Sequence, residues 1–222
     1  MITALVPVKR NSTRVPDKNF RVFSHSNLTC IKINQLLRVG GLQVMVNSDS
    51  EPVLDELEKM YKDNLKYVLR DSYYGTSKCT ASEFFIDLAS KAQTPDVMYA
   101  PVTSPLISDI TLETCINAYK DRHMYCYDSV VTVVSVKDHL WFSGNPLNYQ
   151  HKKVPNSQDL PDIVKITYGA CLLPQVTMIQ NGNVVGDKPN FIRLNEQEAW
   201  DIDTELDFKL AEYMYEQMRS NL

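Results

Sequence analysis

The chain has 222 residues, of which 44% are hydrophobic and 23% charged, and its formal net charge is −4. This composition is typical of a globular protein with a buried core, and it excludes a collagen-like, coiled-coil or disordered chain. A mildly acidic chain is also a poor candidate for general binding to nucleic acid or to an anionic membrane. No apolar run approaches the roughly 20 residues needed to span a bilayer.

Short β-rich apolar runs alternate with helical patterns along the chain. The predicted strands are 2–8, 43–46, 66–69, 96–100 and 129–136, and the predicted helices are 28–39, 52–61, 80–91, 111–120 and 204–218. This alternation is typical of βαβ units. We therefore expect one α/β domain over 1–222, with a three-layer, mostly parallel sheet that is covered by helices on both faces.

The periodicity breaks down from about 141 to 168, where glycine, asparagine and proline recur at short intervals. We interpret this segment as an arm or flap that leaves the sheet, and not as a separate domain. The chain is expected to return through Gly169–Pro174.

The cysteines and the first apolar run bear on the compartment. The cysteines are scattered and lack CxxC spacing, which favours reduced thiols over a zinc cluster or a disulfide framework. The run 2–8 has no basic region before it, so it is typical of a buried strand and not of a signal peptide. We expect a cytoplasmic protein.

A basic loop follows the first predicted strand. Four cations lie within ten residues, interleaved with Asn11, Ser12 and Asn19; they are Lys9, Arg10, Arg14 and Lys18. Such a cluster favours a polyanion such as a triphosphate, although a solvated basic loop has the same composition. The loop contains no glycine, so it is neither a Walker A loop nor a GxGxxG fingerprint.

A pair of carboxylates lies near the other end of the chain. Asp201 and Asp203 are two positions apart, so in an extended segment they project to the same side. Two such groups are typical of a Mg²⁺ site that is completed by phosphate oxygens and water. The alternative is that both serve only as negative charge before the last helix, which Thr204 is placed to cap. Together, the basic loop and the carboxylate pair favour metal-dependent handling of a nucleoside triphosphate.

The run Leu5-Val-Pro-Val-Lys-Arg-Asn-Ser-Thr-Arg-Val-Pro-Asp-Lys-Asn19 resembles the nucleotide-binding loop of the CMP-sialic acid synthetases (acylneuraminate cytidylyltransferases), A-R-x-x-S-K-x-x-P-x-K-N. Further similarities follow in the family's order at Val46–Asp49, Val68–Arg70, Pro101–Leu106 and Gly169–Ala170. The segment Asp201–Glu212 is similar to the family's D-I-D-T-x-x-D-x-x-x-A-E. The resemblance covers essentially the whole chain, and its first and last motifs are the specific ones.

This resemblance implies a Rossmann-like nucleotidyltransferase that converts CTP and a sugar acid into a CMP-sugar and pyrophosphate. By position, the nucleotide site would comprise Lys9, Asn11, Ser12, Lys18, Asn19 and Arg70. Lys9, Lys18, Asp201 and Asp203 would be catalytic, and the two aspartates would hold Mg²⁺. Thr103, Ser104 and Lys165 would contact the acceptor. The arm would pair two copies into a homodimer. No general base is assigned.

Four positions depart from the family pattern, namely Lys9, Thr13, Ser77 and Pro101. Pro101 stands where the sialic acid enzymes have a glutamine that contacts the sugar, and the loss of such a hydrogen bond changes which acceptor is accepted. We therefore expect CTP and metal use to be retained with an acceptor other than ordinary sialic acid, such as legionaminic or pseudaminic acid. The alternatives are a CMP-Kdo-type enzyme, a cytidylyltransferase for another acid or phosphonate, a non-catalytic nucleotide-binding homologue, and a plain structural domain.

Overall fold

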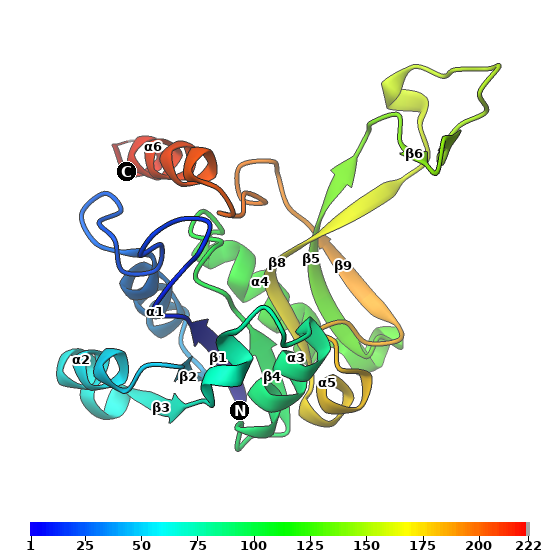
Figure 1. Cartoon of the computed structure of the whole chain (residues 1–222). Coiled ribbons are helices and arrows are strands. Elements are labelled where there is room, and N and C mark those ends of the chain that lie inside the picture. The colour runs from blue at the N-terminus through cyan, green and yellow to red at the C-terminus, as the bar shows by residue number, and fades with distance from the viewer. Residues whose placement is uncertain (221–222) are drawn as a thin grey trace.

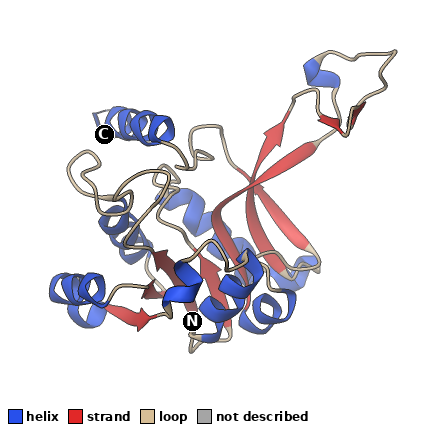
Figure 2. Ribbon diagram, viewed as in Figure 1, coloured by secondary structure: helices blue, strands red, loops and turns tan. Residues whose placement is uncertain are grey.

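Seven strands of residues 1–220, the part of the chain that the computed structural model describes, form one sheet in the order β3-β2-β1-β4-β8-β5-β9 (Figures 1 and 2). These strands are β1 (Ile2–Val8), β2 (Leu42–Ser48), β3 (Leu65–Leu69), β4 (Asp96–Tyr99), β5 (Ser129–Val136), β8 (Ile163–Pro174) and β9 (Pro189–Arg193). The helices are α1 (Leu28–Val39), α2 (Glu51–Tyr61), α3 (Ala81–Ser90), α4 (Asp109–Lys120), α5 (Gln175–Asn181) and α6 (Glu205–Ser220).

The sheet is mostly parallel, as expected from the sequence. β1 pairs in parallel with β2 and with β4, and the pairs β2–β3 and β5–β9 are also parallel. β8 runs antiparallel to both of its neighbours, β4 and β5. A parallel return requires a crossover, usually a helix, whereas β5 and β8 are joined by the arm and form a long hairpin, which makes them antiparallel.

Alternate side chains of the central strands point into two separate cores. On β1, Ala4 and Val6 belong to a core shared with α1, α2, α4 and α6, whereas Leu5 belongs to a core shared with α3 and α5. This alternation follows from the two-residue period of a strand. The sheet is therefore buried on both faces, which confirms the expected three-layer arrangement.

Strong local signals determine where the main helices begin and end. Asn27 accepts a hydrogen bond from the backbone N–H of Cys30 at the start of α1, and Thr80 forms a capping box with Glu83 at the start of α3. α1 ends at Gly40, whose φ of 72° is a conformation that favours glycine. By contrast, α5 and β9 were not predicted, because each is a short element without a clear periodic pattern.

The arm is shorter than the sequence indicates. β8 begins at Ile163, and residues 163–166 pair with β5 in a ribbon that extends out of the sheet (Figure 1). Beyond this ribbon lie the short strands β6 (Trp141–Phe142) and β7 (Asn145–Pro146), which pair with each other. Among residues 1–220, no helix is both long and apolar enough to cross a membrane.

Candidate active site

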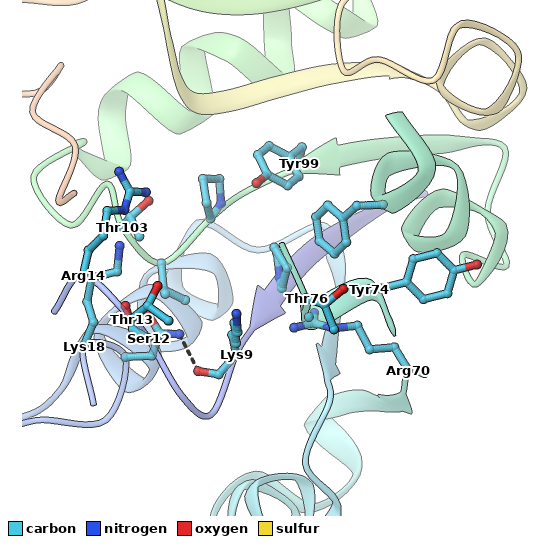
Figure 3. Close-up of a pocket in the computed structure, with 16 residues that line it drawn as sticks. Lys9, Ser12, Thr13, Arg14, Lys18, Arg70, Tyr74, Thr76, Tyr99 and Thr103 are labelled. Atoms are coloured by element: carbon cyan, nitrogen blue, oxygen red, sulfur yellow. Dashed lines mark hydrogen bonds between the residues drawn. The ribbon is translucent and has the colours of Figure 1, made fainter. Parts of the chain in front are cut away.

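The loops that follow β1, β2, β3 and β4 meet at one edge of the sheet. The parallel register aligns the ends of β1 and β2 at Val8 and Ser48, and the ends of β2 and β3 at Ser48 and Leu69. A cavity of about 360 Å³ lies between these loops (Figure 3). It is lined by Pro7, Lys9, Ser12, Thr13, Arg14, Lys18, Asn19, Arg70, Tyr74, Gly75, Thr76, Phe84, Tyr99, Pro101, Val102 and Thr103. We refer to it as the first cavity.

Asp49 connects three of these loops. Its Oδ1 atom accepts a hydrogen bond from the backbone N–H of Arg10 at 3.1 Å and lies 3.9 Å from Nη2 of Arg70. A Cβ atom at Gly75 would lie only 2.5 Å from Asp49 Oδ2, so a side chain there would displace the carboxylate. The absence of a side chain at Gly75 thus allows the loop after β3 to approach the loop after β2.

Arg70 is a buried cation in the wall of the first cavity. Its Nη1 atom donates to the backbone oxygen and to Oδ1 of Asn47, at 3.1 and 2.9 Å, and Nη2 donates to the oxygen of Val8 at 3.3 Å. Burial lowers the pKa of the Arg70 guanidinium, which nevertheless stays charged at neutral pH. Its Nε atom makes no hydrogen bond within residues 1–220, so this buried donor remains free for a ligand or a water molecule.

The basic loop divides between the cavity and the solvent. The side chain of Lys9 projects into the first cavity (Figure 3), whereas Asn11 is exposed and is not among the lining residues. Asn19 donates from Nδ2 to the oxygen of Lys9 at 2.8 Å, which holds the loop in place. Its buried Oδ1 atom has no partner in the described part of the chain. Thr13 and Arg14 also line the cavity; Arg14 is one of the four cations of the predicted cluster, whereas Thr13 was noted only as a departure from the family pattern.

Lys18 joins the basic loop to the segment that carries the two carboxylates. Its Nζ atom donates to the backbone oxygen of Ile202 at 2.6 Å. Burial lowers the pKa of the Lys18 amine, and the nearby carboxylates of Asp201 and Asp203 oppose that shift. The basic loop and the carboxylate pair, which lie far apart in the sequence and were predicted to act together, are therefore adjacent in space.

Asp201 lies between the first cavity and a second one. Its carboxylate accepts a hydrogen bond from the side chain of Thr103, and the backbone N–H of Ile202 donates to the oxygen of Thr103 at 3.0 Å. Burial raises the pKa of Asp201, and the neighbouring negative charge of Asp203 raises it further. A buried carboxylate beside a second one is a group that a bound cation would stabilise.

The other two aspartates of this segment already have partners. Asp203 forms an ion pair with Arg14 at 2.7 Å. Asp207 accepts from the backbone N–H of Thr204 at 2.7 Å, and Thr204 Oγ1 accepts from the backbone N–H of Asp207 at 3.2 Å. This reciprocal pair forms a capping box at the start of α6, so Thr204 caps this helix as expected.

The donor set fits a cation that shares its ligands with a phosphate. Within residues 1–220, no group of three or more histidine, cysteine or acidic side chains is placed to hold a metal by itself. Mg²⁺ commonly takes one or two protein carboxylates and completes its shell with phosphate oxygens and water. Asp201 and Asp203 match this requirement, and the cation-lined first cavity lies next to them.

The second cavity measures about 630 Å³ and lies beneath the β5–β8 ribbon. It is lined by Val134, Ser135, Val136, Asp138, Lys165, Ile166, Thr167, Tyr168, Glu196, Ala199, Trp200, Asp201, Asp203 and Asp207. Tyr168 has a φ of 57°, a conformation that is costly for a non-glycine residue and that recurs at functional sites. Tyr168 lies in the irregular stretch of β8 between Ile166 and Cys171, which are paired with Val133 and Val131 on either side of a register shift.

The residues expected to contact an acceptor are distributed over different surroundings. Lys165 lines the second cavity, and Thr103 lines the first cavity while its side chain bonds to Asp201. Ser104 lines neither cavity: it is 2% exposed, and its backbone oxygen accepts from the buried Lys32.

Sequence reasoning also missed the aromatic part of the first cavity, formed by Tyr74, Phe84 and Tyr99. The guanidinium of Arg70 lies 5.5 Å from the ring centroid of Phe84, and Tyr99 makes an edge contact with Phe85. Because these residues come from three different elements, no local sequence pattern predicts that they lie together. The only available signal is that Tyr99 stands at the end of a predicted strand, where ligand-binding residues are expected.

No family model and no curated protein matches this chain in sequence. Solved structures do match it in fold. The CMP:2-keto-3-deoxy-manno-octonic acid synthetase complexed with CTP has a TM-score of 0.70 at 13% identity, over 98% of this chain and 99% of that one.

Two other solved structures also match this chain in fold. The 4-diphosphocytidyl-2C-methyl-D-erythritol synthase from Anaerococcus prevotii has a TM-score of 0.68 at 13% identity, over 97% of this chain and 96% of that one. The bifunctional IspDF from Campylobacter jejuni has a TM-score of 0.67 at 16% identity, and the match covers 94% of this chain but only 53% of that larger one. The chain therefore shares the α/β fold of these proteins.

Proposed function

We propose that this protein is a CTP-dependent cytidylyltransferase that transfers CMP to a sugar-acid acceptor, with Mg²⁺ as cofactor and pyrophosphate as product. The observation that carries this proposal is the contact between the cation-lined first cavity and the Asp201–Asp203 pair, made through Lys18 and Thr103. This is an arrangement for a polyphosphate and a divalent cation. The fold is shared with the CMP:2-keto-3-deoxy-manno-octonic acid synthetase complexed with CTP, and this fold-level analogy favours CTP among the nucleotides.

In the proposed reaction, a hydroxyl of the acceptor attacks the α-phosphorus of CTP in line and releases its proton to solvent. The new O–P bond replaces the bond to pyrophosphate, which leaves. Lys9 and Lys18, together with the charge of Arg70, offset the negative charge that develops on the phosphate oxygens. Asp201 and Asp203 would hold Mg²⁺, which supplies further positive charge to those oxygens when bound. Thr103 orients the Asp201 carboxylate, and Asn19 holds the basic loop through the oxygen of Lys9.

The second cavity is the proposed acceptor site, because it shares Asp201 and Asp203 with the phosphate side. Lys165 is placed to pair with the carboxylate of a sugar acid. Legionaminic and pseudaminic acids are the first acceptors to test, because Pro101 departs from the pattern of the sialic acid enzymes. Pro101 lines the first cavity and not the second, so its effect on the acceptor would act from the nucleotide side. The arm supports a homodimer, because Trp141 and Phe142 of its strand β6 are 52% and 70% exposed.

A second candidate is an octulosonic acid as acceptor. The structural similarity to the octonic acid synthetase extends over 98% of this chain and favours this variant. Another acid, a phosphonate or a phosphate ester remains a third group of acceptors. A non-catalytic homologue would bind the nucleotide in the same first cavity without releasing pyrophosphate.

Thermal unfolding with each of the four ribonucleoside triphosphates, with and without Mg²⁺, tests the nucleotide and the metal without an acceptor. A ligand at 100 times its Kd adds about 2.7 kcal/mol, which raises the Tm of a chain of this size by roughly 5–10 °C. We expect this shift for CTP, and we expect it to be larger with Mg²⁺. Equal shifts with all four nucleotides, or none, would contradict the proposal.

Pyrophosphate release then distinguishes the acceptors. CTP and Mg²⁺ are incubated with N-acetylneuraminic, legionaminic, pseudaminic and octulosonic acids in parallel. We expect release with an acid other than N-acetylneuraminic acid. Equal turnover of N-acetylneuraminic acid would contradict the altered specificity, and CTP binding without release for any acceptor would favour the non-catalytic homologue.

A further inference from the structure

Lys32 is a lysine in the interior of the protein that the proposed reaction does not use. It lies on α1, and its side chain is 0% exposed. Its Nζ atom donates to Oε1 of Gln35 and to the backbone oxygen of Ser104, both at 2.9 Å. The charged group that acts on it is Asp109 of α4, which is paired with Arg38 of α1 at 2.9 Å.

Burying an amine in this way is costly. Burial lowers the pKa of Lys32 to about 7, since the charged form is poorly solvated in the core. Replacing a buried charged group by an apolar side chain of similar volume often leaves the stability of a protein unchanged or increases it. The two hydrogen bonds of Lys32 are therefore the feature that distinguishes it from a methionine at the same place.

Lys32 and its hydrogen-bond partner Gln35 both contact the loop between β4 and α4. Lys32 holds it at Ser104, and Nε2 of Gln35 donates to the oxygen of Ile107 at 2.5 Å and to Oδ1 of Asp109 at 3.1 Å. α1 is thus hydrogen-bonded to this loop at Ser104 and Ile107, and to the start of α4 at Asp109.

The same loop carries Thr103, one residue before the carbonyl that Lys32 holds. The oxygen of Thr103 accepts from the backbone N–H of Ile202 at 3.0 Å, and its side chain bonds to the Asp201 carboxylate. The oxygen of Ile202 in turn accepts from Lys18 Nζ at 2.6 Å. A continuous series of contacts therefore runs from Lys32 to Lys18, which lines the first cavity and is proposed to contact the phosphates.

We propose that Lys32 is a positioning residue for the cation and nucleotide site: it holds the Ser104 carbonyl and thereby fixes Thr103 against Asp201 and Ile202. This inference rests on the proposed function, because it assigns Lys32 to the same site. Lys32 touches neither ligand and acts through the loop between β4 and α4.

The test compares Lys32→Met with the wild-type protein in Mn²⁺ binding, followed by electron paramagnetic resonance in the presence of CTP. Methionine has nearly the same length but donates no hydrogen bond. We expect Mn²⁺ to bind about tenfold more weakly, which corresponds to about 1.4 kcal/mol, because Thr103 is no longer held in place and must be ordered when the ion binds. A Lys32→Gln variant keeps an N–H donor and is expected to lose less.

Tyr119→Phe is the matched control. It also removes one buried donor, the Tyr119 hydroxyl that bonds to Asp96 Oδ1 at 2.6 Å, but at the other end of β4 and α4. A purely structural role of Lys32 predicts that both variants lose stability and neither loses Mn²⁺ affinity. We expect only the Lys32 variants to lose Mn²⁺ affinity.

A double-mutant cycle with Thr103→Val tests the route. If Lys32 acts through Thr103, the two substitutions together weaken Mn²⁺ binding by clearly less than the product of their separate effects. If the two substitutions have independent effects on Mn²⁺ binding, or if Lys32→Met binds Mn²⁺ with wild-type affinity, the inference is overturned while the proposed function stands. Absence of Mn²⁺ and CTP binding in the wild-type protein would instead overturn the proposed function, and the inference with it.

Discussion

The two cavities at the end of the sheet have opposite charge. Among residues 1–220, the first cavity is lined by four cations and no carboxylate; the cations are Lys9, Arg14, Lys18 and Arg70. The second has one cation, Lys165, and five carboxylates, which are Asp138, Glu196, Asp201, Asp203 and Asp207. The chain as a whole has a net charge of only −4, so the contrast is produced by the fold and not by the composition.

The contrast arises because each cavity is built from a different part of the chain. Loops after the parallel strands β1, β3 and β4 supply the first, whereas the β5–β8 ribbon and residues 196–207 supply the second. They meet where Lys18 bonds to Ile202 and Thr103 bonds to Asp201. The proposed polyphosphate in the first cavity and the proposed cation at the carboxylates of the boundary would complement each other. Substitutions on each side should therefore have separable effects.

The largest predicted effect is on stability, and it concerns Lys32, which holds the loop between β4 and α4. Since the pKa of Lys32 falls from 10.5 in the unfolded chain to about 7 in the folded one, the unfolded chain binds one more proton between these values. The free energy of unfolding of the wild-type protein should then rise relative to Lys32→Met by about 1.4 kcal/mol per pH unit, or roughly 3 kcal/mol over two units above pH 7.5.

Urea unfolding of both proteins at several pH values measures this difference. The comparison cancels other groups, such as Cys115, whose pKa is raised to about 12 by burial. The unsatisfied Ser104 oxygen left in Lys32→Met lowers its stability equally at every pH and does not change the slope. Parallel curves for the two proteins would show that Lys32 stays protonated in the fold.

Arg70→Met tests whether the cations of the first cavity also hold its loops together. The substitution leaves the oxygens of Asn47 and Val8 without their buried donor, so we expect a loss of about 3 kcal/mol in the free energy of unfolding. The control is Arg38→Met, because the Arg38–Asp109 ion pair is largely exposed and should contribute less than about 1 kcal/mol. Equal losses in both would contradict a structural role of Arg70.

Lys9→Met and Lys165→Met remove one cation from each cavity. We expect Lys9→Met to weaken CTP binding by about 10- to 100-fold, the equivalent of one charge-assisted hydrogen bond of about 1.5–3 kcal/mol. Lys165→Met should leave CTP binding unchanged and should affect only the acceptor. Isothermal titration of both variants with CTP and Mg²⁺ measures this, and similar losses would mean that the two cavities do not act separately.

The smallest expected effect is at the boundary itself. Arg14 pairs with Asp203 at 2.7 Å, and both side chains are more than a third exposed, so the pair adds less than about 1 kcal/mol to stability. Arg14→Gln frees the carboxylate, and we expect Mn²⁺ without nucleotide to bind a few times more tightly. Unchanged or weaker Mn²⁺ binding would show that Asp203 is not a ligand.

The fold was predictable where signals are local and strong. The strands over 2–8 and 129–136 and the helix over 28–39 occur with the predicted bounds, since each combines a clear periodicity with a turn or a cap. The end of the arm was not predictable, because residues 163–166 become part of a strand only by pairing with β5. Tertiary pairing overrides weak local preference in such segments.

The sequence by itself determined the sheet type, the position of the basic loop and the two-residue spacing of Asp201 and Asp203, because these depend on neighbours along the chain. The tertiary structure decided everything that joins distant segments. It brings Lys18 to Ile202 across 184 positions, buries Lys32 beneath the loop that carries Thr103, and gathers carboxylates around the second cavity. Such contacts follow from how the strands are ordered and from which faces are buried, and no local pattern encodes either.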